Sequence, residues 1–335
     1  MNSSHNYLID FLRFFAATWV VLFHFNEVTV YQNNTYREIV KLGHLGVPIF
    51  FVISGYCIML ATEHTKKPID FLIRRFFRIY PAFWASLLIV VLAVILNYIL
   101  AEVNSVTVLP KNLIALIATV TLLTDPFSNI PTMNWVYWSL TYEIFFYIII
   151  FIYLFIPMKL RFLWLLLITG LSILLSKHNH WLFFFTQHWP AFLLGISVYK
   201  INNGFRAKGY LKGSILLVFA LICLFFPQTP KQLPYQITCI LTSLLIYLNH
   251  FWPFKGNIIS RLGDYSYSIY LIHIPVGVYI LGFLKNSYGY EKNLFMNILW
   301  DLIAYLVVLI MARWIFNKIE KPYITYGKTL IKKLY

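Results

Sequence analysis

The chain has 335 residues, of which 60% are hydrophobic and 12% charged, with a net charge of +15 and a mean hydropathy of +0.72. This composition excludes a soluble domain. It predicts an all-α, polytopic integral membrane protein, because the apolar runs are continuous and do not alternate as membrane β-strands do. The basic residues lie in short loops between these runs, so they indicate membrane topology and no nucleic-acid partner.

Eleven apolar stretches follow one another along the chain. They cover residues 7–27, 45–62, 80–101, 112–124, 136–156, 162–176, 188–200, 213–227, 236–251, 265–284 and 295–317. The stretch 112–124 is short for a span and is flanked by Pro110 and Pro126. We therefore predict a single membrane domain over residues 1–335, a helical bundle with about ten transmembrane helices and one short segment that does not span.

The loop charges predict how this bundle is oriented. With 112–124 outside the count of spans, 18 of the 27 Lys and Arg residues fall in inner loops and the C-terminal tail, and 7, Lys285 among them, fall in outer loops. This bias predicts that both termini are cytoplasmic. The loop from Lys66 to Arg78 is then cytoplasmic, and the stretch 7–27 runs from inside to outside.

The first stretch carries three ionisable side chains, Asp10, Arg13 and His24. Arg13 and His24 are eleven residues apart, which places them on one helix face about 16 Å apart along the axis. Ionisable groups are costly inside a bilayer, so this stripe predicts a functional site. The alternatives are a packing or interfacial histidine and, for Glu27 one turn later, a solvated helix end.

The second stretch contains Gly46, Ser54, Gly55 and Tyr56. Small residues let a helix or a ligand approach closely, and Ser54 can hydrogen-bond to a neighbouring helix. Ordinary helix packing accounts for the same pattern.

Arg74, Arg75 and Arg78 form a basic group at the cytoplasmic boundary. Arg75 and Arg78 are spaced i, i+3, and planar guanidinium groups bind phosphate or pyrophosphate bidentately. An anchor for anionic lipids combined with a topology signal is the alternative.

The stretch 136–156 carries Trp138, Ser139 and, about two turns into the helix, Glu143. A carboxyl in such surroundings can act as a general acid or base. A buried carboxyl paired with an arginine is the alternative.

In the stretch 265–284, Ser266, Tyr270 and His273 are spaced i, i+4, i+7 and share one helix face. Pro275 frees a backbone carbonyl one turn earlier, near Leu271. The stripe predicts the lining of a polar cavity or, alternatively, hydrogen bonds between helices.

Taken in order, these motifs resemble the membrane acyltransferase-3 family, the bacterial O-acyltransferases of cell-surface glycans. The resemblance covers almost the whole chain and is to the stand-alone members without an SGNH domain. It departs at Phe11, where the family has Gly after the first Asp. The motifs are Arg13-x10-His24, Phe-Phe-x-Ile-Ser54-Gly55-Tyr56, Arg74-Arg75-x-x-Arg78-Ile-x-Pro81, Trp138-Ser139-Leu-x-x-Glu143, Ser-Tyr-Ser-Ile-Tyr-Leu-Ile-His273-x-Pro275 and the closing Ile319-Glu320-Lys321-Pro322.

The resemblance implies a cytoplasmic acyl-CoA donor, a sugar hydroxyl as acceptor, and no permanently bound cofactor or metal. On this hypothesis the acyl group passes Arg13, and His24, tuned by Glu143 or Asp10, deprotonates the hydroxyl. Tyr270 or Ser139 stabilises the oxyanion. Direct transfer and an acyl-histidine intermediate both stay open. The CoA-binding candidates are Arg74, Arg75 and Arg78; the substrate-binding candidates are Ser54, Tyr56, Trp138, Ser139, Tyr270 and His273.

The expected enzyme is therefore an acyl-CoA-dependent O-acyltransferase, with acetyl as the default acyl group, in the lipid bilayer of a bacterial inner membrane. Its acceptor is a surface glycan or a lipid-linked sugar precursor. A transporter or flippase of a lipid-linked glycan is the main alternative, because it also places charges within helices. A non-catalytic membrane scaffold is the second. The release of free thiol from acyl-CoA separates the enzyme from the transporter, whereas glycan acylation by a variant that lacks Arg13, His24 and Glu143 would support the scaffold.

Overall fold

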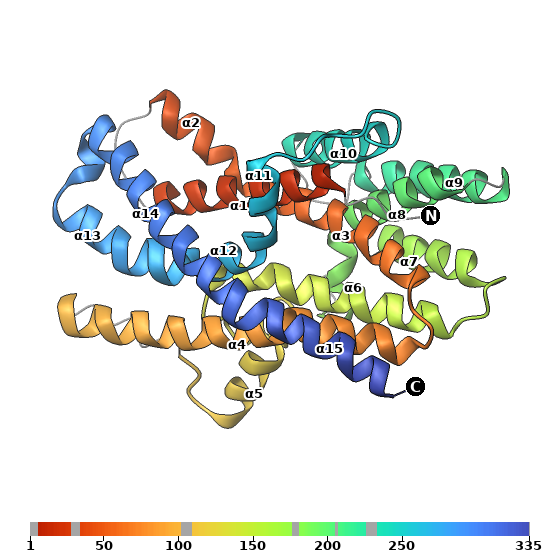
Figure 1. Cartoon of the computed structure of the whole chain (residues 1–335), viewed down its shortest axis with the longest axis horizontal. Helices are drawn as coiled ribbons and strands as arrows, with labels where there is room; N and C mark the ends of the chain where they lie inside the picture. The colour runs from red at the N-terminus through yellow and green to blue at the C-terminus, as the bar shows by residue number, and fades with distance from the viewer. Residues whose placement is uncertain are drawn as a thin grey trace.

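The computed structural model describes residues 6–27, 34–101, 109–175, 181–204, 207–225 and 233–334. These ranges form helices and connecting segments and contain no β-strand (Figure 1). The α-helices are α1 (Tyr7–Glu27), α2 (Thr35–Lys41), α3 (Gly46–Glu63), α4 (Pro68–Ala101), α5 (Leu113–Thr121), α6 (Trp138–Phe155), α7 (Arg161–Leu175), α8 (Trp189–Asn203), α9 (Ala207–Phe225), α10 (Leu233–Leu248), α11 (Ile258–Arg261), α12 (Ser266–Ile272), α13 (Leu281–Ser287), α14 (Leu294–Ile315) and α15 (Lys321–Lys333).

The predicted membrane bundle is confirmed. Six helical segments in the described ranges are long and apolar enough to cross a membrane, and α7, α9 and α10 are shorter apolar helices. The helix α5 has 9 residues, which rise about 14 Å, less than half of a ~30 Å hydrocarbon core. The segment 112–124 is therefore too short to span, as expected.

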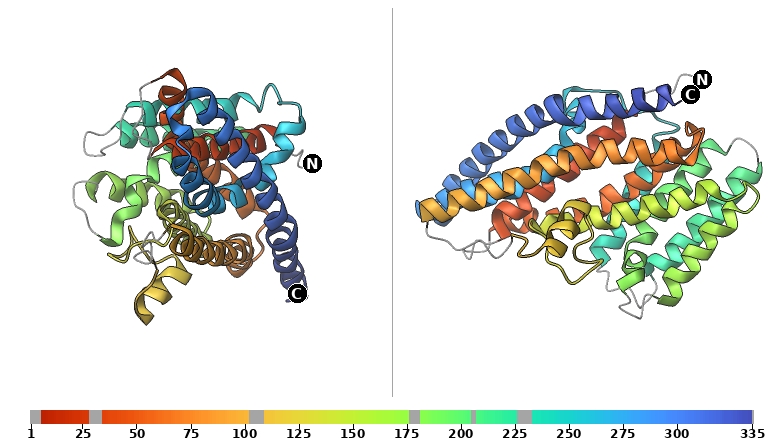
Figure 2. Two further views of the ribbon diagram at one scale, coloured as in Figure 1. Left: turned by 90° about the vertical axis from the view of Figure 1, so that its left-hand side faces the viewer. Right: turned by 90° about the horizontal axis from the view of Figure 1, so that it is seen from below.

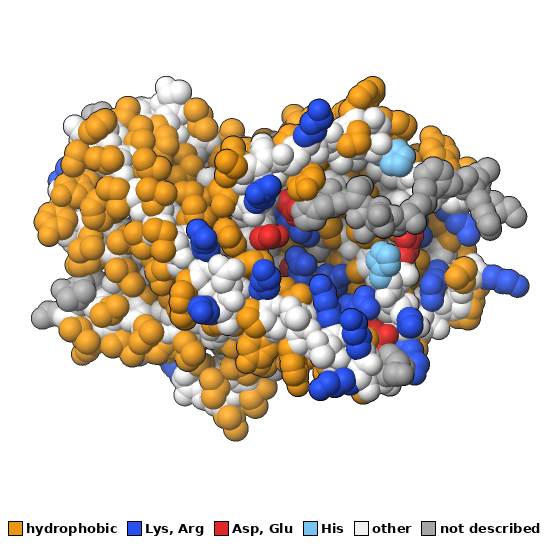
Figure 3. All heavy atoms as spheres, in the orientation of Figure 1, with side chains coloured by type: hydrophobic (Ala, Val, Ile, Leu, Met, Phe, Trp, Pro, Cys, Tyr) orange, Lys and Arg blue, Asp and Glu red, His pale blue; other side chains and the backbone are white. Residues whose placement is uncertain are grey.

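The helices run roughly along the long axis of the molecule, and α1 begins toward the end of the bundle at which α15 finishes (Figures 1 and 2). On the face drawn in Figure 3, hydrophobic side chains cover the half over α13 and the start of α14, whereas Lys and Arg gather on the half where α15 ends. Both ends of the described chain lie toward this basic half of the molecule. The orientation in the membrane stays a prediction.

Helices α3 and α8 pack with their backbones in contact. A Cβ added at Gly55 would lie 2.0 Å from the Phe192 carbonyl oxygen, and one at Gly195 would lie 2.0 Å from that of Val52. Gly46 meets the Ala16 carbonyl of α1 in the same way, at 2.5 Å. The glycines of the second apolar stretch therefore serve close helix approach.

Three parts of the chain that the loop count treats as loops or tail are helical. Helix α4 already begins at Pro68, because proline suits the first helical turn and Asp70 Oδ2 accepts a hydrogen bond from the Lys67 N–H at 3.2 Å. Arg74, Arg75 and Arg78 thus lie within the helix. The tail predicted beyond residue 317 continues as helix to Lys333, and Lys285 is a buried helical residue of α13.

The Leu271 carbonyl oxygen, which Pro275 leaves without a helical donor, accepts a hydrogen bond from another segment. After α12 the chain forms a π-helical stretch, His273–Ile280, and Asn134 Nδ2 donates to the Leu271 carbonyl oxygen at 3.3 Å. Asn134 Oδ1 also accepts from the Val136 N–H, at 3.2 Å, just before α6. The proline of one helix therefore fixes the start of another, which places the first residues of α6 beside α12.

Candidate active site

A cavity of about 90 Å³ opens among α1, α3, α4, α6 and α12, and we call it the inner cavity. It draws its polar lining from five of the six sequence motifs, although they are far apart along the chain. The predicted site residues that line it are Arg13, Ser54, Arg75, Arg78, Ser139, Glu143 and Tyr270, and Ser266 of the predicted stripe joins them.

Arg75 and Arg78 enter the inner cavity from successive turns of α4. Within the described residues, neither guanidinium forms an ion pair with a carboxylate. The Arg75 guanidinium carbon lies 5.3 Å from the ring centroids of Phe71 and Tyr147, and its buried Nε has no hydrogen-bond partner. The charge of Glu143 acts on both guanidinium groups, and that of Glu320 on Arg78, without a direct ion pair within the described residues. Two partly buried cations that are not directly paired favour an anionic ligand, because their desolvation cost is offset only in part.

Glu143 is held by neutral donors from two helices. Its Oε1 accepts hydrogen bonds from Ser54 Oγ of α3, at 3.1 Å, and from the Tyr147 hydroxyl one turn along α6. No arginine forms an ion pair with it within the described ranges. The alternative of a carboxyl paired with an arginine is therefore wrong, and Glu143 is a positioned acceptor at the wall of the inner cavity.

Ser139 and Tyr270 bring two hydroxyl groups together at the cavity wall. Their oxygens are 2.7 Å apart, so one hydroxyl donates to the other, and the Val136 carbonyl oxygen accepts from the hydroxyl whose proton is left, with Ser139 Oγ at 3.1 Å and the Tyr270 oxygen at 2.9 Å. Both side chains are buried. The proton that is donated to Val136 can turn toward the cavity, so this hydroxyl pair can supply a hydrogen bond to a developing oxyanion.

His24 faces a second cavity, of about 210 Å³, which we call the outer cavity. Its Nδ1 lies 2.8 Å from Glu27 Oε2 and 3.4 Å from Trp135 Nε1. We assign the Nδ1 proton to the shorter contact, which orients the ring by a carboxylate and leaves Nε2 as the basic nitrogen. His24 and Glu27 thus form a histidine–carboxylate pair, and Glu27 is more than a solvated helix end.

The expected pairing of His24 with Glu143 or Asp10 is wrong. Asp10 lies 3.7 Å from Arg13 Nη1, and its position fourteen residues before His24 corresponds to about 21 Å along α1. Glu143 lines the inner cavity and His24 the outer one.

Tyr270 and His273 stand between the two cavities. Tyr270 lines the inner cavity, and the His273 ring, less than one turn later, lies 5.3 Å from the ring of His24. His273 Nδ1 lies 2.8 Å from the Tyr270 carbonyl oxygen and its buried Nε2 has no partner.

Besides Asp10 and His273, three predicted residues line neither cavity. Tyr56 packs on Tyr199 with ring centroids 5.3 Å apart, and Trp138 lies in an aromatic cluster, 5.6 Å from His188. Arg74 has a buried Nε without a hydrogen-bond partner.

Sequence reasoning missed a second set of buried polar residues beside the outer cavity. Lys285 Nζ lies 2.7 Å from Asp301 Oδ1, and Asp301 Oδ2 accepts from Asn26 Nδ2 at 2.8 Å. The signal was present, because Asp301 is an ionisable residue within the apolar stretch 295–317. The rule that singled out Arg13 and His24 applies equally to Asp301.

Comparison with protein families gives one match, an acyltransferase-domain model of the acyltransferase-3 type, over residues 6–316. Comparison with curated proteins and with solved structures found no match. The matched range contains every residue named for the two cavities. The chain therefore belongs to the acyltransferase-3 family and is a membrane acyltransferase.

Proposed function

We propose that the protein moves an acyl group, by default acetyl, from cytoplasmic acyl-CoA to a hydroxyl of a cell-surface glycan or its lipid-linked precursor in a bacterial inner membrane. The observation that carries this proposal is the pair Arg75 and Arg78, two guanidinium groups at the inner cavity that form no direct ion pair with a carboxylate among the described residues. The phosphates of CoA supply the missing negative charge, and guanidinium groups hold phosphates bidentately.

The donor enters from the end of the bundle at which the basic side chains gather. Its phosphates bind Arg75 and Arg78, and its acyl end extends past Arg13 toward the hydroxyl groups of Ser139 and Tyr270. This direction follows from the predicted positive-inside orientation. It brings the thioester carbonyl to the Ser139–Tyr270 hydroxyl pair, which donates one hydrogen bond to the negative charge that develops on its oxygen.

His24 acts on the acceptor, which reaches it through the outer cavity. His24 Nε2 takes the proton of the acceptor hydroxyl while the hydroxyl oxygen attacks the thioester carbon. When the carbon–sulfur bond breaks, the thiolate leaves and takes this proton from His24, so the products are an ester and free CoA thiol. An acyl-histidine intermediate gives the same products in two steps. In either case the side chains of Tyr270 and His273, which separate the cavities, adjoin the reacting atoms.

The reaction is tested in nanodiscs with acetyl-CoA and glycan from cells that lack the gene. We expect free thiol to appear together with glycan that is heavier by one acetyl group. A transporter or flippase moves glycan without consuming acetyl-CoA, so glycan movement with no thiol release contradicts the proposal.

The acceptor route is tested at Gly282, which lines the outer cavity. Within the described residues, a Cβ at Gly282 meets only the Gly277 carbonyl oxygen, at 3.4 Å, so a longer side chain extends into open space. We expect Gly282→Leu to lower kcat/KM for the acceptor at unchanged CoA affinity. Gly170→Leu is the matched control, because a Cβ at Gly170 on α7 meets nothing within 4 Å. Equal acceptor kinetics in the two variants contradict entry through the outer cavity.

A further inference from the structure

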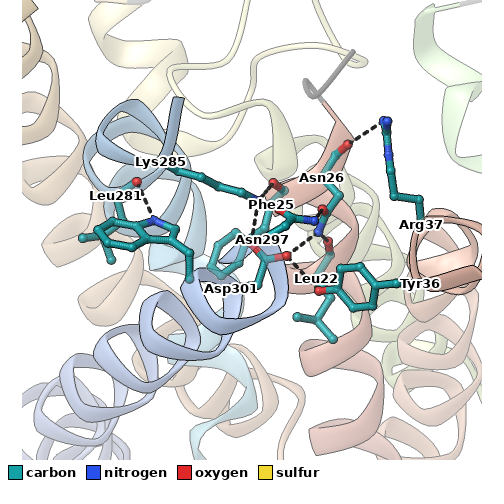
Figure 4. Close-up of polar contacts among 10 residues, drawn as sticks. Leu22, Phe25, Asn26, Tyr36, Arg37, Leu281, Lys285, Asn297 and Asp301 are labelled. Atoms are coloured by element: carbon teal, nitrogen blue, oxygen red, sulfur yellow. Dashed lines mark hydrogen bonds and ion pairs between the residues drawn. The ribbon is translucent and has the colours of Figure 1, made fainter. Parts of the chain in front are cut away.

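Lys285 of α13 and Asp301 of α14 form an ion pair that the proposed reaction does not use. Lys285 Nζ lies 2.7 Å from Asp301 Oδ1, and both side chains are 2% exposed. Figure 4 shows the two side chains reaching toward one another between their helices, with Asn26 and Tyr36 at the other carboxylate oxygen. A buried pair of this kind is costly to form and gives little stability by itself, so its presence calls for another role.

The ion pair is joined to the last turn of α1. Asp301 Oδ2 accepts hydrogen bonds from Asn26 Nδ2 and from the Tyr36 hydroxyl, both at 2.8 Å. Lys285 Nζ also donates to the Phe25 carbonyl oxygen, at 3.3 Å. Helices α1, α2, α13 and α14 therefore meet at one carboxylate.

The hydrogen bonds of this network involve residues of α1 that precede and follow His24. The Asn26 amide that donates to Asp301 also donates to the Leu22 carbonyl oxygen, at 3.0 Å, so residues on both sides of His24 belong to the network. The last carbonyl groups of a helix have no partner within it, and a cation near them is favourable. Lys285 satisfies the carbonyl of Phe25, the residue next to His24, and so fixes the backbone from which the imidazole projects.

We propose that the Lys285–Asp301 pair is a positioning device for His24. It holds the last turn of α1 so that the imidazole keeps its contact with Glu27 and faces the outer cavity, which Lys285 and Asp301 also line. The inference rests on the proposed function, in which His24 is the base. Lys285 and Asp301 act through the helix and do not touch the reacting atoms.

The test compares the double variant Lys285→Met/Asp301→Asn with the intact protein in nanodiscs. The double variant leaves no unpaired cation, so it avoids the folding defect expected of Asp301→Asn alone. We expect kcat to fall about 100-fold, because a shift of about 1 Å at a reacting group costs that much. In the double variant, KM for acyl-CoA should stay within about twofold of the intact protein's value, since Arg75 and Arg78 are unchanged. The single variant Asp301→Glu keeps the negative charge, so we expect it to retain most of the intact protein's kcat.

Tyr305→Phe is the matched control. It removes the hydrogen bond between the hydroxyls of Thr18 and Tyr305, 2.6 Å apart, which joins the same helices α1 and α14 six residues before His24. We expect this variant to keep kcat within about twofold.

Wild-type kcat in a folded double variant overturns the positioning role, and so does an equal loss of kcat in Tyr305→Phe, since any contact between α1 and α14 would then suffice. His24→Ala in the same assay separates the two claims. Full transfer by that variant overturns the proposed base itself. An inactive His24→Ala beside an unaffected double variant overturns only the inference about Lys285 and Asp301.

Discussion

The inner and outer cavities hold buried cations in opposite states. At the inner cavity, Arg75 and Arg78 form no ion pair within the described part of the chain, and the carboxylate nearby in the lining, Glu143, accepts hydrogen bonds from Ser54 and Tyr147. At the outer cavity, Lys285 lies 2.7 Å from Asp301. The charges of Arg75 and Arg78 are therefore available to a ligand, whereas the charge of Lys285 is already neutralised by Asp301 within the protein.

This difference shows how a membrane protein can use the same costly groups for two purposes. A buried cation without a partner carries a free-energy penalty that an anionic ligand removes on binding, so it favours recognition. A cation that is already neutralised cannot recognise an anion in this way and instead joins helices. The inner cavity is thus suited to bind phosphate, and the network at the outer cavity is suited to hold His24.

The largest effect is expected when the proposed base at the outer cavity, His24, is removed. We expect His24→Ala to lower kcat for transfer about 1000-fold, because general base catalysis contributes about 10²–10⁴-fold, with the affinity for CoA unchanged. His44→Ala is the control. His44 is an exposed histidine of the same outer end, with its ring 5.6 Å from that of Phe23, and its removal should leave kcat unchanged. Transfer at the wild-type rate by His24→Ala contradicts the account.

The wall between the cavities is tested at Tyr270. Tyr270→Phe removes one of the two hydroxyls that lie 2.7 Å apart, and we expect kcat to fall about 100-fold with KM for acyl-CoA little changed, as for the loss of one oxyanion donor. Steady-state kinetics at saturating acceptor measure the two parameters separately. A rise in KM alone would assign Tyr270 to donor binding.

The proposed binding of acyl-CoA by the guanidinium groups of the inner cavity is tested at Arg78. We expect Arg78→Ala to raise KM for acyl-CoA about 10- to 100-fold, because a hydrogen bond to a charged group is worth about 1.5–3 kcal/mol. The effect should shrink at high salt. Arg261→Ala removes an exposed arginine of α11 that does not line the inner cavity, and it should leave KM unchanged. Equal KM values for both variants would reduce Arg78 to a topology signal.

The smallest effect is expected at Glu27. Glu27→Gln keeps a hydrogen-bond acceptor 2.8 Å from His24 Nδ1 but removes the charge, so kcat should fall about tenfold. Glu143→Gln tests the rejected pairing. If it lowers kcat in the same way and Glu27→Gln does not, His24 depends on Glu143 after all.

Much of the fold was predictable from local patterns. The apolar stretches match the helices within a few residues at most ends, since a long apolar run can only satisfy its backbone in a membrane as helix. Gly55 and Pro275 were also informative, because each acts through its own backbone, by close approach and by a freed carbonyl. Such effects depend little on which helices become neighbours.

The division of the site into two cavities was not predictable in this way. The face of α6 that meets α3 brings Glu143 to Ser54 and away from His24, and only helix packing decides which faces meet. The pair of Lys285 and Asp301 was missed for a similar reason. Lys285 lies near a segment end, where the pattern equally predicts a solvated loop, and its partner belongs to another helix.

The central claim, that the open guanidinium groups of the inner cavity bind the phosphates of CoA, is tested most directly by calorimetric titration in nanodiscs. Coenzyme A and pantetheine, which lacks the phosphates, are titrated into the intact protein and into Arg75→Gln/Arg78→Gln. The account predicts that the double variant loses about 100-fold or more in affinity for coenzyme A and binds pantetheine as the intact protein does. Equal affinity of both proteins for coenzyme A would contradict it.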